Sequence, residues 1–296
     1  MKYLLMLLIS CGCFLTVKAQ EFDTEGHRGG RALMPENTIP AMINGVRTGV
    51  RTLELDCQIT ADGKVMVSHD PVMSSNIMLK PDGSEIAKGE EKKYVLYKMP
   101  YDSIRLFQEG VKQHPDFPGQ KMVKTYKPLL ADLIDSVENY VKVNHLKPVY
   151  YNMETKSRPA GDNITNPVPE VFVKLLMAVI TQKKIADRVI IQSFDPRTLQ
   201  VLHHDWPQMK TAFLTSTGCY EENINKLGFK PTIISPEFKS VNEAMVKSAH
   251  ENKVLVLPWT VNNETDMKAM ADLKVDGIIS DYPDRLVKLF GSYQKK

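Results

Sequence analysis

The sequence lacks the features that mark several common protein classes. Only four of its 296 residues are cysteines, and two of these lie in the first thirteen positions, so no disulfide framework is expected. After the N-terminal segment no apolar run is long enough to span a bilayer, so no transmembrane segment is predicted in the mature chain. Neither a Gly-x-Gly-x-x-Gly nor a Gly-x-x-x-x-Gly-Lys loop occurs, which disfavours a nucleotide-binding open sheet.

An excess of one charge is also missing. The formal net charge is +3, and Lys2 and Lys18 lie in an N-terminal segment that we expect to be removed. The remainder then carries 36 basic and 35 acidic residues. A protein that binds nucleic acid needs a concentrated basic face, so nucleic acid is not expected among its partners.

Residues 1–19 are predicted to be a signal peptide. An apolar stretch covers positions 4–17, and Val17-Lys18-Ala19 is a small-residue cleavage pattern. An exported protein, periplasmic or secreted, is therefore expected. An alternative is cleavage before Cys11, because Leu8-Ile9-Ser10-Cys11 resembles a lipoprotein box and would give a lipid-anchored N-terminus.

The remainder, 20–296, alternates between strand-like and helix-like segments. Continuous Val/Ile/Leu runs between amphipathic stretches favour a parallel sheet covered by helices. About eight such units predict a single TIM-type (β/α)8 barrel domain. The predicted strands cover 52–59, 65–68, 149–154, 189–194, 211–214, 232–234, 254–258 and 277–280. The predicted helices cover 39–49, 129–144, 168–184, 196–204, 221–227, 241–251, 265–273 and 283–290.

One long segment, about 71–127, interrupts this alternation after the second strand region. It is rich in Lys, Glu, Gly, Asp and Pro and contains a turn signal, Pro81-Asp82-Gly83. A short helix is predicted over 102–109. A loop of this length in a compact barrel is usually functional, so we expect an insertion lying over the barrel mouth; a surface decoration without ligand contact is the alternative.

Three carboxylates are expected to meet at one edge of the sheet. Glu54 and Asp56 are two apart on one strand and therefore face the same side, and Glu154 closes the next long strand. Cys57 should then face away from them. Carboxylates brought this close repel one another unless a cation is present, and oxygen-only ligands favour Mg²⁺ or Ca²⁺ over zinc. Taken alone, a Glu-x-Asp pair is more often a solvated edge or an ion-pair partner.

Two histidines and two cations occur at strand ends: His27 and Arg28 end the first strand-like segment, His69 follows the run at 65–68, and Lys156 follows the run at 149–154. His27 and His69 suit proton transfer, because imidazole titrates near physiological pH. Arg28 offers a planar fork for phosphate oxygens, and Lys156 adds a second positive charge. Structural pairing of Arg28 with Asp23 or Glu25 is the alternative for that residue. The joint occurrence of all these groups indicates metal-assisted chemistry on a phosphate ester.

Taken in order, these motifs resemble the glycerophosphodiester phosphodiesterase family, from about Phe22 to Phe290. The N-terminal blocks are the more specific ones. The matching blocks are Gly26-His27-Arg28-Gly29, Pro35-Glu36-Asn37-Thr38, Glu54-Leu55-Asp56, Thr60-Ala61-Asp62-Gly63, His69-Asp70-Pro71, Asn152-Met153-Glu154-Thr155-Lys156, Gln192-Ser193-Phe194, Pro258-Trp259-Thr260-Val261-Asn262 and Asp276-Gly277-Ile278-Ile279-Ser280-Asp281-Tyr282-Pro283.

The resemblance implies hydrolysis of glycerophosphodiesters to sn-glycerol 3-phosphate and an alcohol with Ca²⁺ or Mg²⁺, a reaction of lipid and glycerol metabolism. By matching position, the acid and base would be His27 and His69. The metal ligands would be Glu54, Asp56 and Glu154, and the phosphate-binding cations Arg28 and Lys156. Trp259 would form an apolar wall for the glycerol carbons; a packed rim tryptophan is the alternative.

Two stretches depart from the family pattern, and both border the insertion. Met73-Ser74-Ser75-Asn76 and Tyr126-Lys127-Pro128-Leu129 stand where many relatives carry other motifs, which affects the expected substrate preference and leaves the reaction class unchanged. An enzyme of the sphingomyelinase D kind, acting on lysolipids, would need an apolar entry, which the Tyr/Leu/Met cluster at 94–101 would supply. A non-catalytic binding barrel would not need paired histidines. The sequence does not define the oligomeric state.

Overall fold

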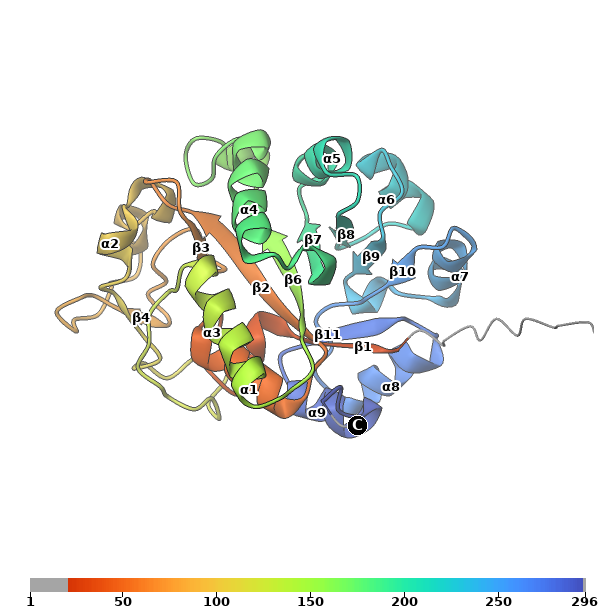
Figure 1. Cartoon of the computed structure of the whole chain (residues 1–296), viewed down its shortest axis with the longest axis horizontal. Helices are drawn as coiled ribbons and strands as arrows, with labels where there is room; N and C mark the ends of the chain where they lie inside the picture. The colour runs from red at the N-terminus through yellow and green to blue at the C-terminus, as the bar shows by residue number, and fades with distance from the viewer. Residues whose placement is uncertain (1–20, 295–296) are drawn as a thin grey trace, which may run out of the picture.

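Eight parallel strands form the centre of the protein in a computed structural model that describes residues 21–294 (Figure 1). The predictions made for 1–19 and for Cys11 lie outside these residues. Along the sheet, neighbours run in the order β10-β9-β8-β7-β6-β2-β1-β11. The strands are β1 Asp23–Gly26, β2 Thr52–Ile59, β6 Tyr150–Thr155, β7 Val189–Ser193, β8 Lys210–Thr215, β9 Ile233–Pro236, β10 Leu255–Val256 and β11 Gly277–Ser280.

The two ends of this sheet approach each other and nearly close the barrel. Beside β10, the backbone N–H of Asp276 donates to the carbonyl of Val256 at 2.9 Å, and that of Ile279 donates to Pro258 at 3.0 Å. These bonds place β11 against both β1 and the segment that follows β10. The predicted TIM-type barrel is therefore confirmed.

Helices cover the outside of the barrel, as Figure 1 shows. Their apolar faces and the outward-facing residues of the strands form the main core, in which Leu53, Leu55 and Cys57 of β2 are fully buried. Cys57 thus packs away from the barrel interior, as predicted. The helices are α1 Ile39–Thr48, α3 Leu130–Val143, α4 Pro169–Lys183, α5 Pro196–Asp205, α6 Tyr220–Leu227, α7 Glu243–Glu251, α8 Glu264–Asp272 and α9 Pro283–Phe290. Single 3-10 turns lie at His27–Gly29, Glu90–Lys93, Leu96–Lys98, Pro159–Gly161, Ala186–Arg188 and Phe238–Ser240. Within 21–294 no helix is both long and apolar enough to cross a membrane.

Two details of the predicted elements are wrong. The run predicted as a strand at 65–68 is β3, Val65–Val67, which pairs antiparallel with β2 and is not a barrel strand. The helix predicted over 102–109 is a single turn, α2 Tyr101–Ile104, and is followed by the strand β5, Gln108–Glu109. In both places the segment is too short for its periodicity to define the pairing or the type of element.

The insertion forms a small unit of its own at one side of the barrel, beyond β3 in Figure 1. The strand β4, Met78–Leu79, pairs antiparallel with β5, and a separate apolar cluster that includes Met73, Leu96 and Ile104 holds the segment together. Two residues of the predicted acyl entry are buried in this cluster: Leu96 is 0% exposed and Tyr101 4%.

The C-terminal half of the insertion contacts the loop that follows β1. The backbone N–H of Lys121 donates to Leu33, and the Gln120 amide donates to the carbonyl of Arg31 at 2.6 Å. The insertion also contains a buried carboxylate, Glu109, which is 1% exposed. Its Oε2 atom lies 3.8 Å from the Lys127 ammonium. Burial raises the pKa of Glu109 to about 7, although the attraction of Lys127 opposes this shift.

The raised pKa of Glu109 predicts a measurable pH dependence of stability. Between the ordinary value of 4.5 and about 7, the unfolded chain binds fewer protons than the folded one, so stability falls as pH rises through this window. A Glu109→Gln variant does not titrate there. Its free energy of unfolding should therefore rise relative to the parent by roughly 3 kcal/mol between pH 4.5 and 7.5. Urea unfolding at both pH values measures the difference. The exposed Glu85→Gln serves as control, and an equal pH response in both variants would contradict the prediction.

Candidate active site

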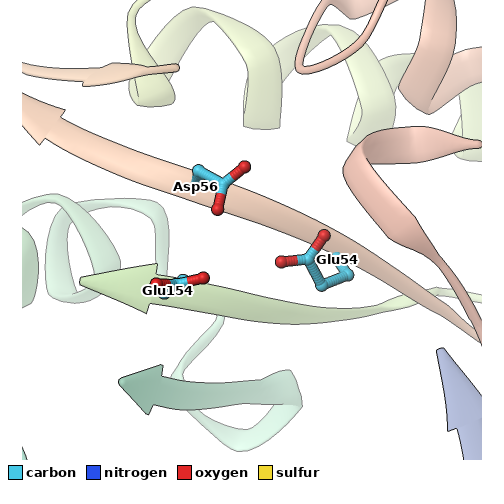
Figure 2. A group of neighbouring side chains, drawn as sticks. All are labelled: Glu54, Asp56 and Glu154. Atoms are coloured by element: carbon cyan, nitrogen blue, oxygen red, sulfur yellow. The ribbon is translucent and has the colours of Figure 1, made fainter. Parts of the chain in front are cut away.

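The carboxylates of Glu54, Asp56 and Glu154 meet across two neighbouring strands, β2 and β6. In the register between β2 and β6, Asp56 stands opposite Glu154 and Glu54 opposite Asn152. Figure 2 shows the three side chains pointing toward one another across these strands. One ligand atom from each lies within 4.8 Å of the others, and all three residues are buried. The predicted convergence of these residues is thus observed.

This cluster carries more negative than positive charge. Burial, followed by repulsion from Asp56, raises the pKa of Glu54 well above its usual range. Burial also raises the pKa of Glu154, although attraction to Lys156 opposes the shift. For Asp56 burial acts in the same direction, but attraction to Lys156 and Arg28 outweighs it, and the pKa is lowered. Asp56 is therefore ionised as it stands, whereas full ionisation of Glu54 and Glu154 requires further positive charge nearby.

The donor set fits a hard divalent cation. It consists of carboxylate oxygens alone, the ligand type that Ca²⁺ and Mg²⁺ prefer. The Oδ1 atom of Asp56 is buried and accepts no hydrogen bond from any residue of 21–294. The Lys156 ammonium lies 3.6 Å from this oxygen, beyond hydrogen-bond range, so a cation held by Asp56, Glu54 and Glu154 would give the buried acceptor a direct partner.

A tight turn after β1 places His27 and Arg28 beside the carboxylates. Arg28 has a left-handed backbone conformation, with φ 51°, and its N–H donates to Glu54 Oε2 at 2.7 Å. Gly29 follows at φ 81°, and a Cβ there would lie 2.8 Å from the carbonyl carbon of Ala41 in α1. The turn therefore needs glycine at that position, because it combines a positive φ with close packing on α1.

The Arg28 guanidinium is held between two carboxylates. One nitrogen donates to Glu36 Oε1 at 2.8 Å, and Nε lies 3.3 Å from Asp56 Oδ2. The neighbouring Asn37 also binds Asp56, donating to Oδ2 at 2.8 Å and accepting from the Asp56 N–H. Arg28 makes its ion pairs here, at the site, and not with Asp23 or Glu25.

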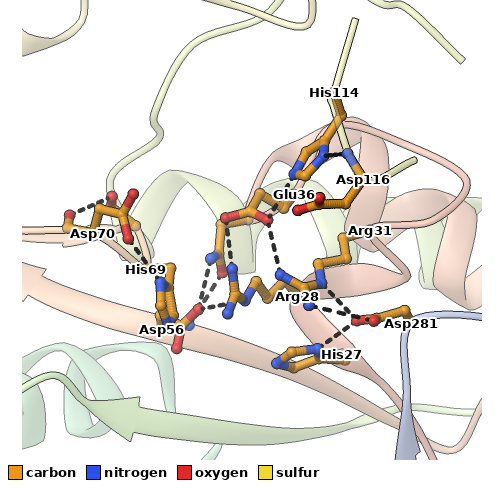
Figure 3. A network of polar contacts seen from close by, with 12 residues as sticks. His27, Arg28, Arg31, Glu36, Asp56, His69, Asp70, His114, Asp116 and Asp281 are labelled. Atoms are coloured by element: carbon orange, nitrogen blue, oxygen red, sulfur yellow. Dashed lines mark hydrogen bonds and ion pairs between the residues drawn. The ribbon is translucent and has the colours of Figure 1, made fainter. Parts of the chain in front are cut away.

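His27 is fixed by a buried aspartate, as Figure 3 shows. Its Nδ1 lies 2.6 Å from Asp281 Oδ1, and its Nε2 points toward Glu54, 4.0 Å from Oε2. Asp281 also binds Arg31 at 2.7 Å and accepts from the Asn262 amide at 2.8 Å. Burial lowers the pKa of His27, which favours its neutral form, although the charge of Asp281 opposes the shift.

His69 sits in a more open position on the other side of the carboxylates. Its Nδ1 lies 2.9 Å from Asp70 Oδ1, and the two side chains are 35% and 44% exposed. The Gln58 amide donates to the His69 carbonyl at 3.1 Å, which holds the backbone of the loop after β3. Each histidine is therefore paired through Nδ1 with a carboxylate, one buried and one near solvent.

A cavity of about 170 Å³ opens above the carboxylates, and we call it the first cavity. Lys156 lines it, with Nζ 3.0 Å from Glu154 and 3.6 Å from Asp56. Trp259 forms part of the apolar wall; its indole N–H donates to the Ser235 carbonyl at 2.8 Å. Among residues 21–294, the predicted site residues in its lining are His27, Arg28, Glu54, His69, Glu154, Lys156 and Trp259.

The insertion was expected to cover the barrel mouth, and its position differs from that expectation. No residue of 71–127 lines the first cavity, as far as the described chain shows. Instead His114 lies 3.8 Å from Glu36, the ion-pair partner of Arg28. The insertion therefore flanks the site and contacts it through a charged group.

Several residues that support the site were not predicted from the sequence. Asp281 directly follows β11 and Gln192 lies within β7, so the rule that led to Glu154 also applies to them. Gln192 donates to Glu54 Oε1 at 2.8 Å. Glu36 lies in a matched motif without an assigned role. His114 had no signal, because its segment has no periodic pattern.

Comparisons with known proteins agree with this geometry. The profile described as the glycerophosphoryl diester phosphodiesterase family matches residues 27–285, nearly the whole barrel. The chain belongs to this family. The predicted resemblance and the prediction of a phosphodiesterase enzyme are confirmed at that level.

Individual relatives span most of the chain. It is 28% identical over 263 residues to a glycerophosphodiester phosphodiesterase of Caldanaerobacter subterraneus subsp. tengcongensis, covering 89% of this chain and 95% of the relative. A solved structure from Silicibacter pomeroyi DSS-3, described as a glycerophosphoryl diester phosphodiesterase, matches with a TM-score of 0.81 and 28% identity, over 92% and 94% of the two chains. The lysophospholipase D GDPD1 of Rattus norvegicus is 24% identical, covering 88% and 83%.

The contact between His27 and Asp281 predicts a large effect of a small substitution. An Asp281→Asn variant keeps the shape of the side chain but removes the charge that orients the imidazole. We expect phosphodiesterase kcat to fall by about 100-fold or more, with the fold retained, because oriented acid–base groups contribute factors of this size. Steady-state kinetics and circular dichroism measure both. Asp284→Asn, an exposed aspartate in the first turn of α9, is the matched control; equal rates in the two variants would refute the role of Asp281.

Proposed function

We propose that the protein hydrolyses glycerophosphodiesters to sn-glycerol 3-phosphate and an alcohol, and that a divalent cation, Ca²⁺ or Mg²⁺, takes part. The observation that carries this proposal is that three buried carboxylates lie together beside the first cavity, which two carboxylate-paired histidines and two cations line. Family membership supports the reaction class.

Glu54, Asp56 and Glu154 would hold the cation. When bound, it would act as a Lewis acid on a phosphate oxygen and lower the pKa of a coordinated hydroxyl. Burial lowers the pKa of Lys156, but attraction to Glu154 and Asp56 outweighs this effect and raises the pKa, so the ammonium stays protonated. Lys156 and Arg28 thus place two fixed positive charges at the position proposed for the phosphate.

The two histidines would move the protons. One imidazole takes a proton from the attacking oxygen as its bond to phosphorus forms. The other gives a proton to the alkoxide as the bond between phosphorus and the alcohol breaks. The attacking oxygen is either a hydroxyl of the substrate glycerol, which gives a cyclic phosphate that water then opens, or water itself. His27 and His69 both border the first cavity, as either route requires.

Trp259 and Phe194 form an apolar wall of the first cavity, against which the glycerol carbons would pack. The two rings contact each other edge to face, with centroids 5.2 Å apart. The lysolipid alternative receives less support, because the residues proposed for an acyl entry pack within apolar clusters or against them.

The N-terminal segment carries a separate proposal, which rests on the sequence of residues 1–19 alone. We propose that the protein is exported after cleavage of a signal peptide. The alternative is a lipoprotein that is anchored through Cys11.

Removal of either histidine tests the acid–base proposal. His27→Ala and His69→Ala should each lower kcat by about 100-fold to 10,000-fold on a glycerophosphodiester, because each removes a proton-transfer group. His204→Ala, whose side chain is 88% exposed, is the control and should retain full activity. Phosphorus NMR follows the products. A near-normal rate in either site variant, with an intact fold by circular dichroism, would exclude that histidine from the chemistry.

Removal of the cation tests the carboxylate cluster. A chelator should abolish turnover, and added Ca²⁺ or Mg²⁺ should restore it. The same ion should raise the melting temperature of the parent, because binding to the folded state alone stabilises it. Glu154→Gln should lose that thermal shift, whereas Glu170→Gln, an exposed glutamate at the start of α4, should keep it. An unchanged shift in Glu154→Gln, or activity indifferent to the chelator, would contradict the proposed metal site.

A further inference from the structure

A second, larger cavity adjoins the first one on the side of His69. Its volume is about 330 Å³, and it extends over the loops that follow β3 and β6. The two cavities share His69, Glu154, Lys156 and Phe194. A phosphate bound between Arg28 and Lys156 would therefore lie at the border of the second cavity. His27 and Trp259 belong to the first cavity only.

We propose that the second cavity binds the alcohol that leaves the phosphorus, and that its polar wall selects an alcohol rich in hydroxyl groups. This inference rests on the proposed function and specifies its substrate class. The glycerol phosphate half of the substrate would occupy the first cavity, between the carboxylates and the apolar wall of Trp259 and Phe194. The alcohol half would extend past His69.

An unpaired acceptor in the second cavity supports the binding of a hydrogen-bond donor. Gln58 is 1% exposed, and its amide nitrogen donates to the His69 carbonyl. That bond fixes the orientation of the amide, because a flipped amide would place two oxygens against each other. The Oε1 atom of Gln58 is buried and has no hydrogen-bond partner in the described part of the chain. A ligand hydroxyl would satisfy it.

The remaining polar groups of the wall offer both donors and an acceptor. Arg158 is exposed at the rim, and its guanidinium forms no ion pair with any residue of 21–294. Asp70 contributes a carboxylate at the opposite side of the loop pair. A hydroxyl group can donate to Gln58 or Asp70 and accept from Arg158, so a polyol uses all three.

A quaternary ammonium alcohol fits this wall less well. Such groups are bound by cages of several aromatic rings. Among the described residues that line the second cavity, Phe194 alone contributes a phenylalanine, tyrosine or tryptophan ring. The positive charges of Arg158 and Lys156 balance the carboxylates of Asp70 and Glu154 in this wall, so net charge gives a cationic alcohol no advantage.

A third cavity, of about 390 Å³, competes for the same role. It lies over the loop before α6, contains Lys226, and shares only Phe194 and Leu214 with the first cavity. None of the histidines, carboxylates or cations of the site lines it, as far as residues 21–294 are concerned. The phosphate therefore borders the second cavity directly and the third one only through apolar side chains.

Two exposed basic residues give a matched test: Arg158 lines the second cavity and Lys226 lines the third. The substrates are glycerophosphoglycerol and glycerophosphocholine, which share the glycerol phosphate half and differ only in the alcohol. Arg158→Ala should lower kcat/KM for glycerophosphoglycerol by about 10-fold or more and leave that for glycerophosphocholine unchanged or raised, because only the polyol loses a charged hydrogen-bond partner. Lys226→Ala should leave the ratio of the two values unchanged.

Gln58→Leu gives a second readout of the same ratio. Loss of the bond to the His69 carbonyl would affect both substrates alike, so the ratio isolates the contact with the alcohol. We expect the parent to prefer the polyol and the ratio to fall in Gln58→Leu.

Each contrary outcome has a defined meaning. A ratio that changes in Lys226→Ala and not in Arg158→Ala would place the alcohol in the third cavity and overturn the inference. A parent that prefers the choline ester would overturn the selection of polyols. Failure of the parent to cleave either ester, with its cation supplied, would instead refute the proposed function on which the inference rests.

Discussion

The register between β2 and β6 is the constraint on which the site depends. It sets Asp56 beside Glu154, and the two-residue repeat of the strand then brings Glu54 to the same face. Three carboxylates buried at one point are unfavourable without compensation. The contacts around them supply part of it: the Arg28 N–H, the Gln192 and Asn37 amides and the Lys156 ammonium. A shift of the register by one residue would turn Asp56 into the apolar layer between sheet and helices.

Compensation extends through the barrel interior. The Gln192 amide that donates to Glu54 accepts from Asn152, and Asn152 donates to Glu25 Oε2 at 2.8 Å. Burial, with repulsion from Asp23, raises the pKa of Glu25 well above its usual range, which favours its neutral form. These hydrogen bonds thus connect the carboxylate cluster to Glu25 in β1. Because Glu25 favours its neutral form, they add no further charge to the barrel interior. The Glu54 side chain is oriented at both oxygens as a result.

The barrel and the principal site residues were predictable because both follow from strand periodicity and strand ends. Glu54, Asp56 and Glu154 could be placed from the alternation of their strands, and Lys156 from its position just after β6. His69 could be placed from its position after a short predicted strand, whereas Trp259 came from a matched motif. The direction of β3 was not predictable, since three apolar residues fit a parallel or an antiparallel pairing equally well. Glu109 and His114 were also beyond reach, because their partners lie in aperiodic loops whose contacts depend on how the insertion folds.

The position of the insertion changes the physical role that its length suggested. A lid would exclude water by covering the cavity, but this segment packs against the loop that carries Arg31 and Glu36. The Arg31 guanidinium lies over the Phe117 ring at 5.1 Å and also binds Asp281, the partner of His27. Glu36 in turn lies between His114 and Arg28. The segment therefore supports both the His27 imidazole and the Arg28 guanidinium through charged contacts, while the mouth beside His69 stays open to the second cavity.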